Sequence, residues 1–153
     1  MKKATRLMLK YLSSANPNAC YVNVSPMHYQ NAEPNRCFRN VMEFLRENND
    51  WQLCSGWLVG DYWQKHGTAV IAHYWIRESS SGMFYDLTPI DDTQKFEYIL
   101  DSEIIDNIDT KNKNAVPVSL KIWQDGRLSA YLGDGRYVNL TEVHHKSLFD
   151  LVD

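Results

Sequence analysis

Two strand-like runs joined by a short turn constrain the fold of this chain more than any other feature of its sequence. Residues 68–77 (TAVIAHYWIR) are rich in β-branched and aromatic side chains, and a second run at 83–87 follows the turn Ser-Ser-Ser-Gly at 79–82. Runs of this kind separated by turn residues are typical of a β-hairpin. We therefore expect an antiparallel sheet that contains this hairpin.

Amphipathic patterns predict helices elsewhere in the chain. The clearest helix spans 37–48 (CFRNVMEFLREN), where apolar side chains fall on one face and charged side chains on the opposite face. Asn35 is expected to cap the start of this helix. The first twelve residues also carry apolar side chains at helical spacing. Residues 141–152 are expected to form a terminal helix with Thr141 as its cap.

The remaining segments predict more strands and complete the expected fold. Strands are expected at 20–24, 51–63, 116–124, 127–131 and 137–140, with a hairpin turn at Asp125-Gly126. The segment 25–36 contains two prolines and is expected to be a loop, and a helix is expected near 96–100. These elements indicate an α+β fold, and the length of 153 residues without a compositional break predicts a single domain over 1–153.

Composition and charge exclude several classes of function. The chain is 44% apolar and 23% charged, which is ordinary for a soluble globular protein. Its net charge of -3 gives no electrostatic reason to expect nucleic acid or a membrane as a partner. No segment is long enough to cross a bilayer. Lys10 and the pair Ser13-Ser14 interrupt the N-terminal stretch too early for a signal peptide, so a cytoplasmic protein with free thiols is expected.

The cysteines and histidines do not form a metal-binding pattern. Cys20, Cys37 and Cys54 make no CxxC pair, and no histidine lies at zinc-finger spacing from them. His144 and His145 are adjacent, and adjacent residues on a helix point about 100° apart. Neither a metal nor another cofactor is therefore expected. Cys20 and Cys54 are expected to be buried thiols.

Three side chains form a candidate nucleophilic site. Cys37 lies in the first turn of a predicted helix, where unpaired N–H groups lower the pKa of a thiol and favour its reactive thiolate. His73 interrupts an otherwise apolar strand and can act as a base, and Asp86 on the next strand can orient it. With the turn centred near Ser80, residues 73 and 86 pair approximately, on the same side of the sheet.

Other interpretations of the same residues remain open. A lone cysteine on a helix is more often a small core residue, and a lone histidine in a strand is usually structural. Asp86 precedes Leu-Thr-Pro and can simply cap a turn. A zinc site made from Cys37, Cys54 and His73 is a more distant alternative.

Four short stretches resemble a known superfamily. They are RCFRNVMEFL (36–45), CSGWLV (54–59), AHYWI (72–76) and GMFYDLTPI (82–90). In this order they resemble the transglutaminase-like and NlpC/P60-like branches of the papain-like cysteine superfamily, and they are similar to a group of small bacterial and phage proteins. The resemblance covers residues 30–90. It implies a nucleophile-bearing helix packed on an antiparallel sheet, with Cys37 as nucleophile, His73 as general base and acid, and Asp86 as the orienting carboxylate.

The resemblance also suggests supporting residues. An oxyanion hole in this superfamily uses the N–H of the nucleophile and a second donor upstream, for which Gln30 and Asn35 are candidates. Trp57 and Trp75 are candidates for lining a substrate cleft, although at least one of them is expected in the core. Asn40 is expected to hold a neighbouring loop rather than to act in the reaction.

These observations lead to two functional hypotheses. The first is a cysteine hydrolase or acyltransferase that acts on an amide bond of a peptide or protein substrate through a thioester on Cys37. The second is a binding or inhibitor protein of the same fold, whose triad is vestigial. The 5 Trp and 9 Tyr suit either a substrate cleft or a binding surface.

Overall fold

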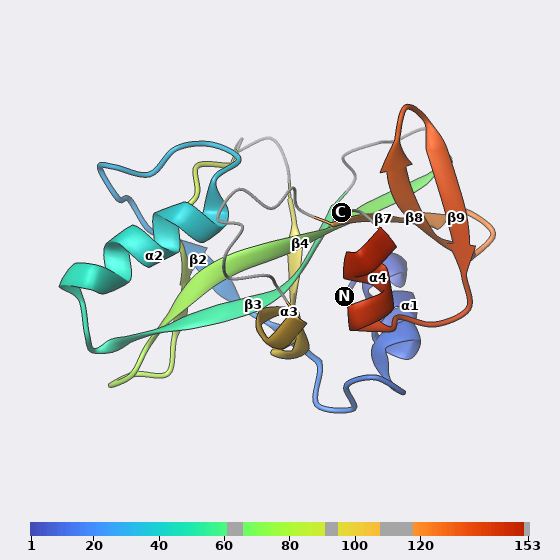
Figure 1. Ribbon diagram of the computed structural model, residues 1–153. Coiled ribbons are helices and arrows are strands. Elements are labelled where there is room, and N and C mark those ends of the chain that lie inside the picture. Colours follow the sequence, from blue (N-terminus) through green and yellow to red (C-terminus); the bar gives the residue numbers. More distant parts are fainter. Residues whose placement is uncertain (61–65, 91–94, 108–117, 152–153) are drawn as a thin grey trace.

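The protein has an α+β fold in which helices pack against one mostly antiparallel sheet (Figure 1). The computed structural model describes residues 1–60, 66–90, 95–107 and 118–151. Within these ranges the helices are α1 (Lys3–Leu12), α2 (Cys37–Glu47), α3 (Glu103–Asn107) and α4 (His145–Leu151). The strands are β1 (Cys20–Val22), β2 (Val24–Pro26), β3 (Trp51–Gly60), β4 (Gly67–Glu78), β5 (Phe84–Asp86), β6 (Glu97–Leu100), β7 (Ser119–Trp123), β8 (Leu128–Gly133) and β9 (Arg136–Leu140).

Two long central strands, β3 and β4, organise the sheet. They pair antiparallel from Trp51 opposite Glu78 to Gly60 opposite Ala69. The strand order is β1-β6-β3-β4-β7-β8-β9, and β5 also pairs with β4 while β2 runs parallel to β5. In Figure 1 these strands connect one end of the molecule, where α2 lies, with the other end, where α1, α4 and the β7–β9 hairpins lie.

One edge of β4 is divided between two partners, and the division leaves a gap. Strand β7 pairs with residues 67–71 of β4, whereas β5 pairs with Ile76 and Arg77. The N–H of Ala72 still donates to the carbonyl of Val118, over 2.9 Å. Within the described residues, the edge of β4 around Tyr74 therefore has no strand partner. The start of α2 lies at this gap.

The main core lies between the helices and one face of the sheet. It combines Met8 and Leu12 of α1, Val41 and Phe44 of α2, and Leu148 of α4 with buried strand residues. The strand residues of this core include Trp57, Val59, Val70, Ala72, Tyr74 and Ile76. Cys54, Leu58, Ala69 and Trp75 are also buried but alternate with these residues, so they point to the other face.

The structure corrects the prediction of a helix near 96–100. Residues 97–100 form β6, which pairs antiparallel with both β1 and β3. Ile99 is fully buried at its centre. A short apolar run does not distinguish a strand from a helix segment by its periodicity, and here two neighbouring strands decided the outcome. The segment 25–36 also departs from a loop at its start, because β2 pairs with β5.

Both predicted helix caps are wrong. Asn35 has φ 61° and lies in the turn before α2, and Arg36 occupies the N-cap position without a side-chain hydrogen bond that caps the helix. A short polar side chain tolerates this left-handed conformation, which explains asparagine there. Helix α4 begins at His145 rather than near Thr141, and the ring Nδ1 of His144 accepts from the N–H of Ser147 over 3.4 Å. Among the described residues, no helix is both long and apolar enough to cross a membrane.

Candidate active site

The N-terminus of α2 presents Cys37 with free backbone donors around it. N–H groups in the first turn of a helix have no partner within the helix, and no side chain caps this end of α2. The first intrahelical bond runs from the N–H of Asn40 to the carbonyl of Arg36, over 2.9 Å. Cys37 therefore lies where partial positive charge collects.

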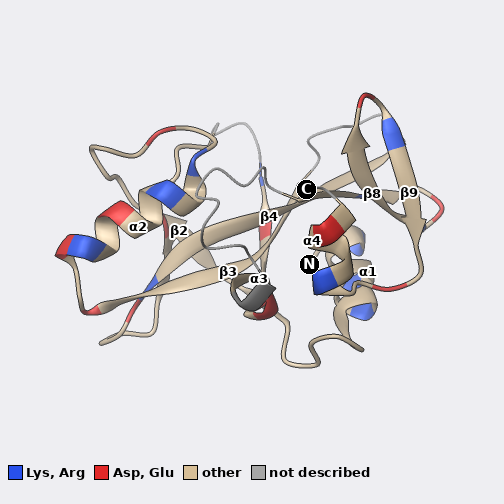
Figure 2. Ribbon diagram, in the orientation of Figure 1, with Lys and Arg blue, Asp and Glu red and all other residues tan. Residues whose placement is uncertain are grey.

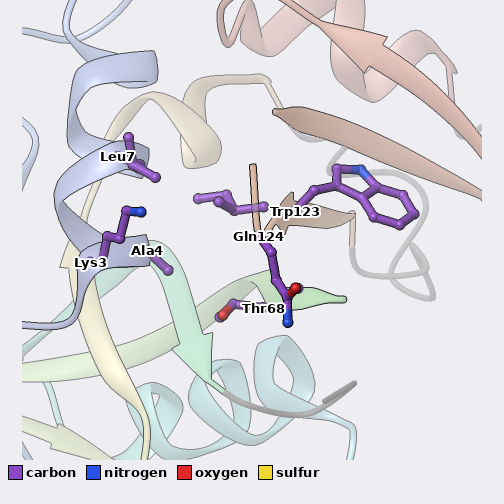
Figure 3. Close-up of a pocket in the computed structure, with 8 residues that line it drawn as sticks. Lys3, Ala4, Leu7, Thr68, Trp123 and Gln124 are labelled. Carbon is purple, nitrogen blue, oxygen red and sulfur yellow. The ribbon is translucent and has the colours of Figure 1, made fainter. Parts of the chain in front are cut away.

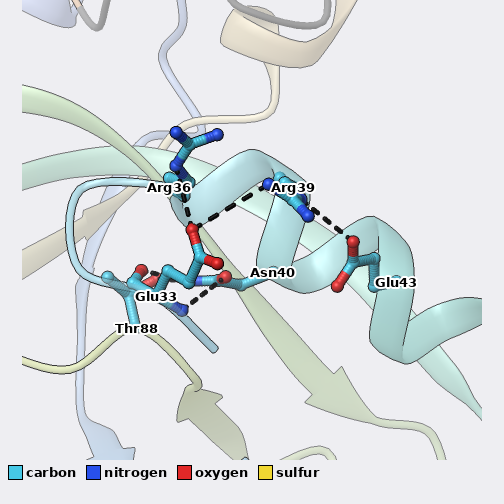
Figure 4. A network of polar contacts seen from close by, with 6 residues as sticks. All are labelled: Glu33, Arg36, Arg39, Asn40, Glu43 and Thr88. Carbon is cyan, nitrogen blue, oxygen red and sulfur yellow. Dashed lines mark hydrogen bonds and ion pairs between the residues drawn. The ribbon is translucent and has the colours of Figure 1, made fainter. Parts of the chain in front are cut away.

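Asn40 fixes the loop that leads into this helix (Figure 4). Its Oδ1 accepts from the N–H of Glu33 over 3.0 Å, and its Nδ2 donates to the carbonyl of Glu33 over 2.9 Å and to the hydroxyl of Thr88 over 3.0 Å. The prediction that Asn40 holds a neighbouring loop is thus confirmed. On the exposed side of the same turn, the Glu33 carboxylate pairs with Arg36 and Arg39. Figure 2 shows acidic and basic residues alternating along the solvent face of α2.

His73 and Asp86 are joined directly. The Nε2 of His73 lies 2.7 Å from Oδ2 of Asp86, and the two residues are 6% and 3% exposed. The register differs from the predicted pairing, because Tyr85 pairs with Ile76 and β5 ends at Asp86. Asp86 therefore reaches His73 diagonally. A shift of two residues keeps both side chains on one face of the sheet, which is why the prediction of proximity survives the change of register.

The thiol of Cys37 completes this series of contacts. The ring of His73 and the backbone of Tyr74 both interact with it electrostatically. Because Nε2 of His73 faces Asp86, the ring nitrogen left for Cys37 is Nδ1. Tyr74 lies at the edge of β4 that has no strand partner among the described residues, so its N–H can be directed toward Cys37. The structure thus brings all three predicted residues together.

Electrostatics favour a thiolate–imidazolium pair. Burial by itself raises the pKa of Cys37, but the charge of His73 and hydrogen bonds from His73 and Tyr74 outweigh it and lower the pKa below its usual value. Burial likewise lowers the pKa of His73, yet the charges of Asp86 and Cys37 raise it to about 10. The pKa of Asp86 is lowered, because the contacts from His73, Tyr98 and Thr88 outweigh its burial.

Two further groups hold the Asp86 carboxylate. Its Oδ1 accepts from the N–H of Thr88 over 2.9 Å, and its Oδ2 accepts from the hydroxyl of Tyr98 over 2.7 Å. The Thr88 contact is the turn-capping role considered for Asp86, so this residue caps a turn and orients His73 at once. Tyr98 was missed, because its segment was predicted as a helix and nothing in the sequence links it to residue 86.

The predicted oxyanion residues are both exposed. Gln30 lines a cavity of about 610 Å³ that also reaches Asp86 and Tyr98, and Asn35 occupies the left-handed turn before α2. No hydrogen bond within the described residues joins either side chain to Cys37. Their role as a second oxyanion donor stays a prediction.

The tryptophans do not line an open cleft, which corrects that prediction. Trp57 and Trp75 are both 0% exposed. Trp57 is part of the main core, and its Nε1 donates to Asp101 over 2.8 Å. Trp75 packs edge-on against Tyr98 with ring centroids 5.3 Å apart, and its Nε1 has no hydrogen-bond partner among the described residues. Gly56 makes room for this ring, because a Cβ there would lie 2.5 Å from it and 1.8 Å from the carbonyl oxygen of Ile99.

The other two cysteines differ from each other. Cys54 is buried as predicted, and burial raises its pKa to about 11. Cys20 is exposed on β1, at the end of the sheet order, so the prediction that it is buried is wrong. Within the described ranges no group of three or more His, Cys, Asp or Glu side chains is arranged to hold a metal ion.

A second buried histidine–carboxylate pair lies away from Cys37. The Nε2 of His145 is 2.6 Å from Oδ2 of Asp101, and Asn16 donates to Oδ1 of the same carboxylate over 2.9 Å.

A second cavity, of about 390 Å³, lies between α1 and the ends of β4 and β7, with Leu7 and Thr68 in its walls (Figure 3). None of the three triad residues lines this second cavity.

Comparisons with known proteins give no relative. The chain matches no family model, no curated protein sequence and no solved structure.

Proposed function

We propose that this chain is a cysteine-dependent hydrolase or acyltransferase that acts on an amide bond, in a peptide or an isopeptide, through a thioester on Cys37. The observation that carries the proposal is the hydrogen bond between the His73 ring and the buried Asp86 carboxylate, together with the electrostatic interaction of the same ring with the Cys37 thiol. A nucleophile, a base and a group that orients the base are the parts that acyl transfer requires.

The proposed reaction begins with the thiolate of Cys37. Its sulfur attacks the amide carbonyl carbon, and the oxyanion that forms accepts from the backbone N–H of Cys37 at the start of α2. The Nδ1–H of the His73 imidazolium then protonates the departing amine, and the carbon–nitrogen bond breaks to leave a thioester. Water or a second amine, deprotonated by His73, next attacks the thioester and releases Cys37 as thiolate.

The cavity beside Asp86 is the candidate binding site for substrate side chains. Its walls are largely apolar, with Met27, Leu87, Ile90 and Phe96 among them, and Lys95 lies at the same cavity. Cavities of several hundred Å³ with apolar walls and a few polar groups are typical of ligand sites. His28, Tyr29, Gln30 and Ala32 form part of its wall. They precede the turn before Cys37 in the chain, and this supports the cavity as the candidate binding site.

One observation favours the alternative of a non-catalytic bacterial or phage binding or inhibitor protein with a vestigial triad. Cys37 is only 9% exposed, and it is not among the residues that line either cavity. A substrate carbonyl would need local opening to reach the sulfur. A binding protein would have no such requirement.

Replacement of Cys37 by serine separates the two functions. Cys37→Ser changes one atom, so the free energy of unfolding should fall by no more than about 1–2 kcal/mol. Acyl transfer needs the thiolate, so activity should fall by several orders of magnitude. The measurement compares the phenotype of wild type and variant in the native host at matched protein levels, with Cys20→Ser as the matched control. A serine form that acts as strongly as wild type would rule out the catalytic proposal for that phenotype.

A further inference from the structure

The hydroxyl of Tyr98 and the ring of His73 converge on one oxygen atom. The hydroxyl oxygen of Tyr98 and Nε2 of His73 each lie 2.7 Å from Oδ2 of Asp86. Since the carboxylate is 3% exposed, these two donors and the N–H of Thr88 replace the water that an exposed carboxylate would have. Tyr98 therefore supplies one of the three hydrogen bonds that the described residues make to this carboxylate.

The sheet holds Tyr98 in a fixed position for its hydrogen bond to Asp86. It lies in β6 between two strands, opposite Val22 of β1 on one side and Leu58 of β3 on the other. Its ring packs against Trp75 with centroids 5.3 Å apart and lies 6.2 Å from the ring of His73. A side chain fixed by two strands and two rings keeps its hydroxyl in one position.

We infer that Tyr98 is a positioning residue of the candidate active site, which holds the Asp86 carboxylate toward His73 and favours the thiolate state of Cys37. The inference rests on the proposed function for its consequence in catalysis. It adds a fourth member to the predicted site, from a strand that the sequence did not associate with it.

The direction in which the Tyr98 hydroxyl shifts thiolate formation at Cys37 follows from the net charge of the site. When Cys37 loses its proton beside an imidazolium and a carboxylate, the cluster changes from neutral to a net charge of -1. Among the described residues, the titratable groups that interact with this cluster are His73 and Tyr74 from β4, Asp86 from β5 and Tyr98 from β6. The hydroxyl of Tyr98 points its hydrogen at Asp86 and so stabilises the anionic state. Removing the hydroxyl should therefore make the thiolate harder to form.

The test is the pH dependence of Cys37 alkylation by iodoacetamide in the full chain, followed by mass spectrometry of the Cys37 peptide. In Tyr98→Phe, which removes only the hydroxyl, the midpoint should move to higher pH by roughly half a unit to one unit, as expected for a lost hydrogen bond to a charged group. The matched control is Tyr85→Phe. Tyr85 precedes Asp86 on the same strand, but within the described residues its hydroxyl donates only to the sulfur of Met83, over 3.8 Å.

Each outcome of this test decides the role of Tyr98. A shift in Tyr98→Phe with no shift in Tyr85→Phe supports the inference. An unchanged midpoint, or an equal shift in both variants, overturns it. Thermal unfolding of both variants shows whether they remain folded, and a purely structural role would lower stability without moving the midpoint. Alkylation requires no turnover, so it tests Tyr98 even if Cys37→Ser shows that the proposed function is wrong.

Discussion

At the scale of single residues, Cys37 combines burial with a lowered pKa, two properties that usually oppose each other. Burial disfavours a thiolate, as Cys54 illustrates with a pKa raised to about 11. Cys37 is 9% exposed, yet the imidazole of His73 and the N–H of Tyr74 reverse the direction of its shift. The contrast between two buried thiols in one chain therefore comes from their partners and not from their exposure.

The three cysteines should consequently show different pH profiles of alkylation. Iodoacetamide labels only the thiolate form of a cysteine, and Cys20 is exposed to the reagent. Labelling of Cys37 should persist to lower pH than that of Cys20, and Cys54 should react slowest at neutral pH because almost none of it is thiolate. His73→Ala should move the Cys37 profile to higher pH. If Cys37 and Cys20 gave profiles with the same midpoint, the thiolate–imidazolium pair would be absent.

At the scale of elements, the site depends on where α2 begins. Its first turn meets β4 at the gap between β5 and β7, and the preceding loop is held by Asn40, which is 1% exposed. This one side chain accepts a hydrogen bond from Glu33 and donates one each to Glu33 and Thr88, the residue whose N–H contacts Asp86. The helix, the loop and the end of β5 are thus linked through a single amide.

Replacing that amide should loosen the loop before it affects the rest of the fold. In Asn40→Ala, the N–H of Glu33 loses its acceptor, so its hydrogen exchange should accelerate. The free energy of unfolding should fall by about 1–3 kcal/mol, because buried partners lose their hydrogen bonds. Exchange measured by NMR and unfolding in urea provide the two readouts. Arg46→Ala, on the exposed side of the same helix, should change neither, and equal effects of the two substitutions would contradict this role for Asn40.

At the scale of the whole molecule, a second buried carboxylate joins segments that are distant in sequence. Asp101 is 0% exposed and accepts hydrogen bonds from Asn16 after α1, Trp57 of β3 and His145 of α4. Burial raises its pKa, but the hydrogen bonds from these three side chains outweigh it and lower the pKa below its ordinary value. This carboxylate ties the N-terminal and C-terminal helices to the sheet.

Loss of this charge should weaken the whole fold and alter its response to acid. Because the pKa of Asp101 is lower in the folded state, its stabilising contribution is complete above the unfolded value of about 4 and disappears as pH falls toward the folded value. Asp101→Asn should lower the free energy of unfolding by roughly 2–4 kcal/mol at pH 7. In the variant, this free energy should also decrease less steeply as pH falls from 5 to 3. Urea unfolding across this range measures both effects. The matched substitution at an exposed turn, Asp125→Asn, should leave the unfolding midpoint at pH 7 unchanged, and a similar loss there would contradict the anchoring role.

The sequence by itself determined the features that local patterns encode. The hairpin around residues 79–82, the amphipathic helix that starts at Cys37 and the hairpin at Asp125-Gly126 all have turn residues or periodic apolar side chains within a short window, and each is present. The proximity of His73 and Asp86 followed from the same local signal. Two residues on neighbouring strands of a tight hairpin stay close even when the register shifts by two.

Only the tertiary structure decided the rest, because it depends on contacts between segments far apart in the chain. Residues 97–100 became a strand through pairing with β1 and β3, and this placed Tyr98 on Asp86. Trp57 and Trp75 were candidates for a cleft, but Trp57 is buried in the main core and Trp75 is buried against the ring of Tyr98. No pattern within a few residues encodes such contacts. They arise when separate elements compete to bury the same apolar surface and to satisfy the same buried polar groups.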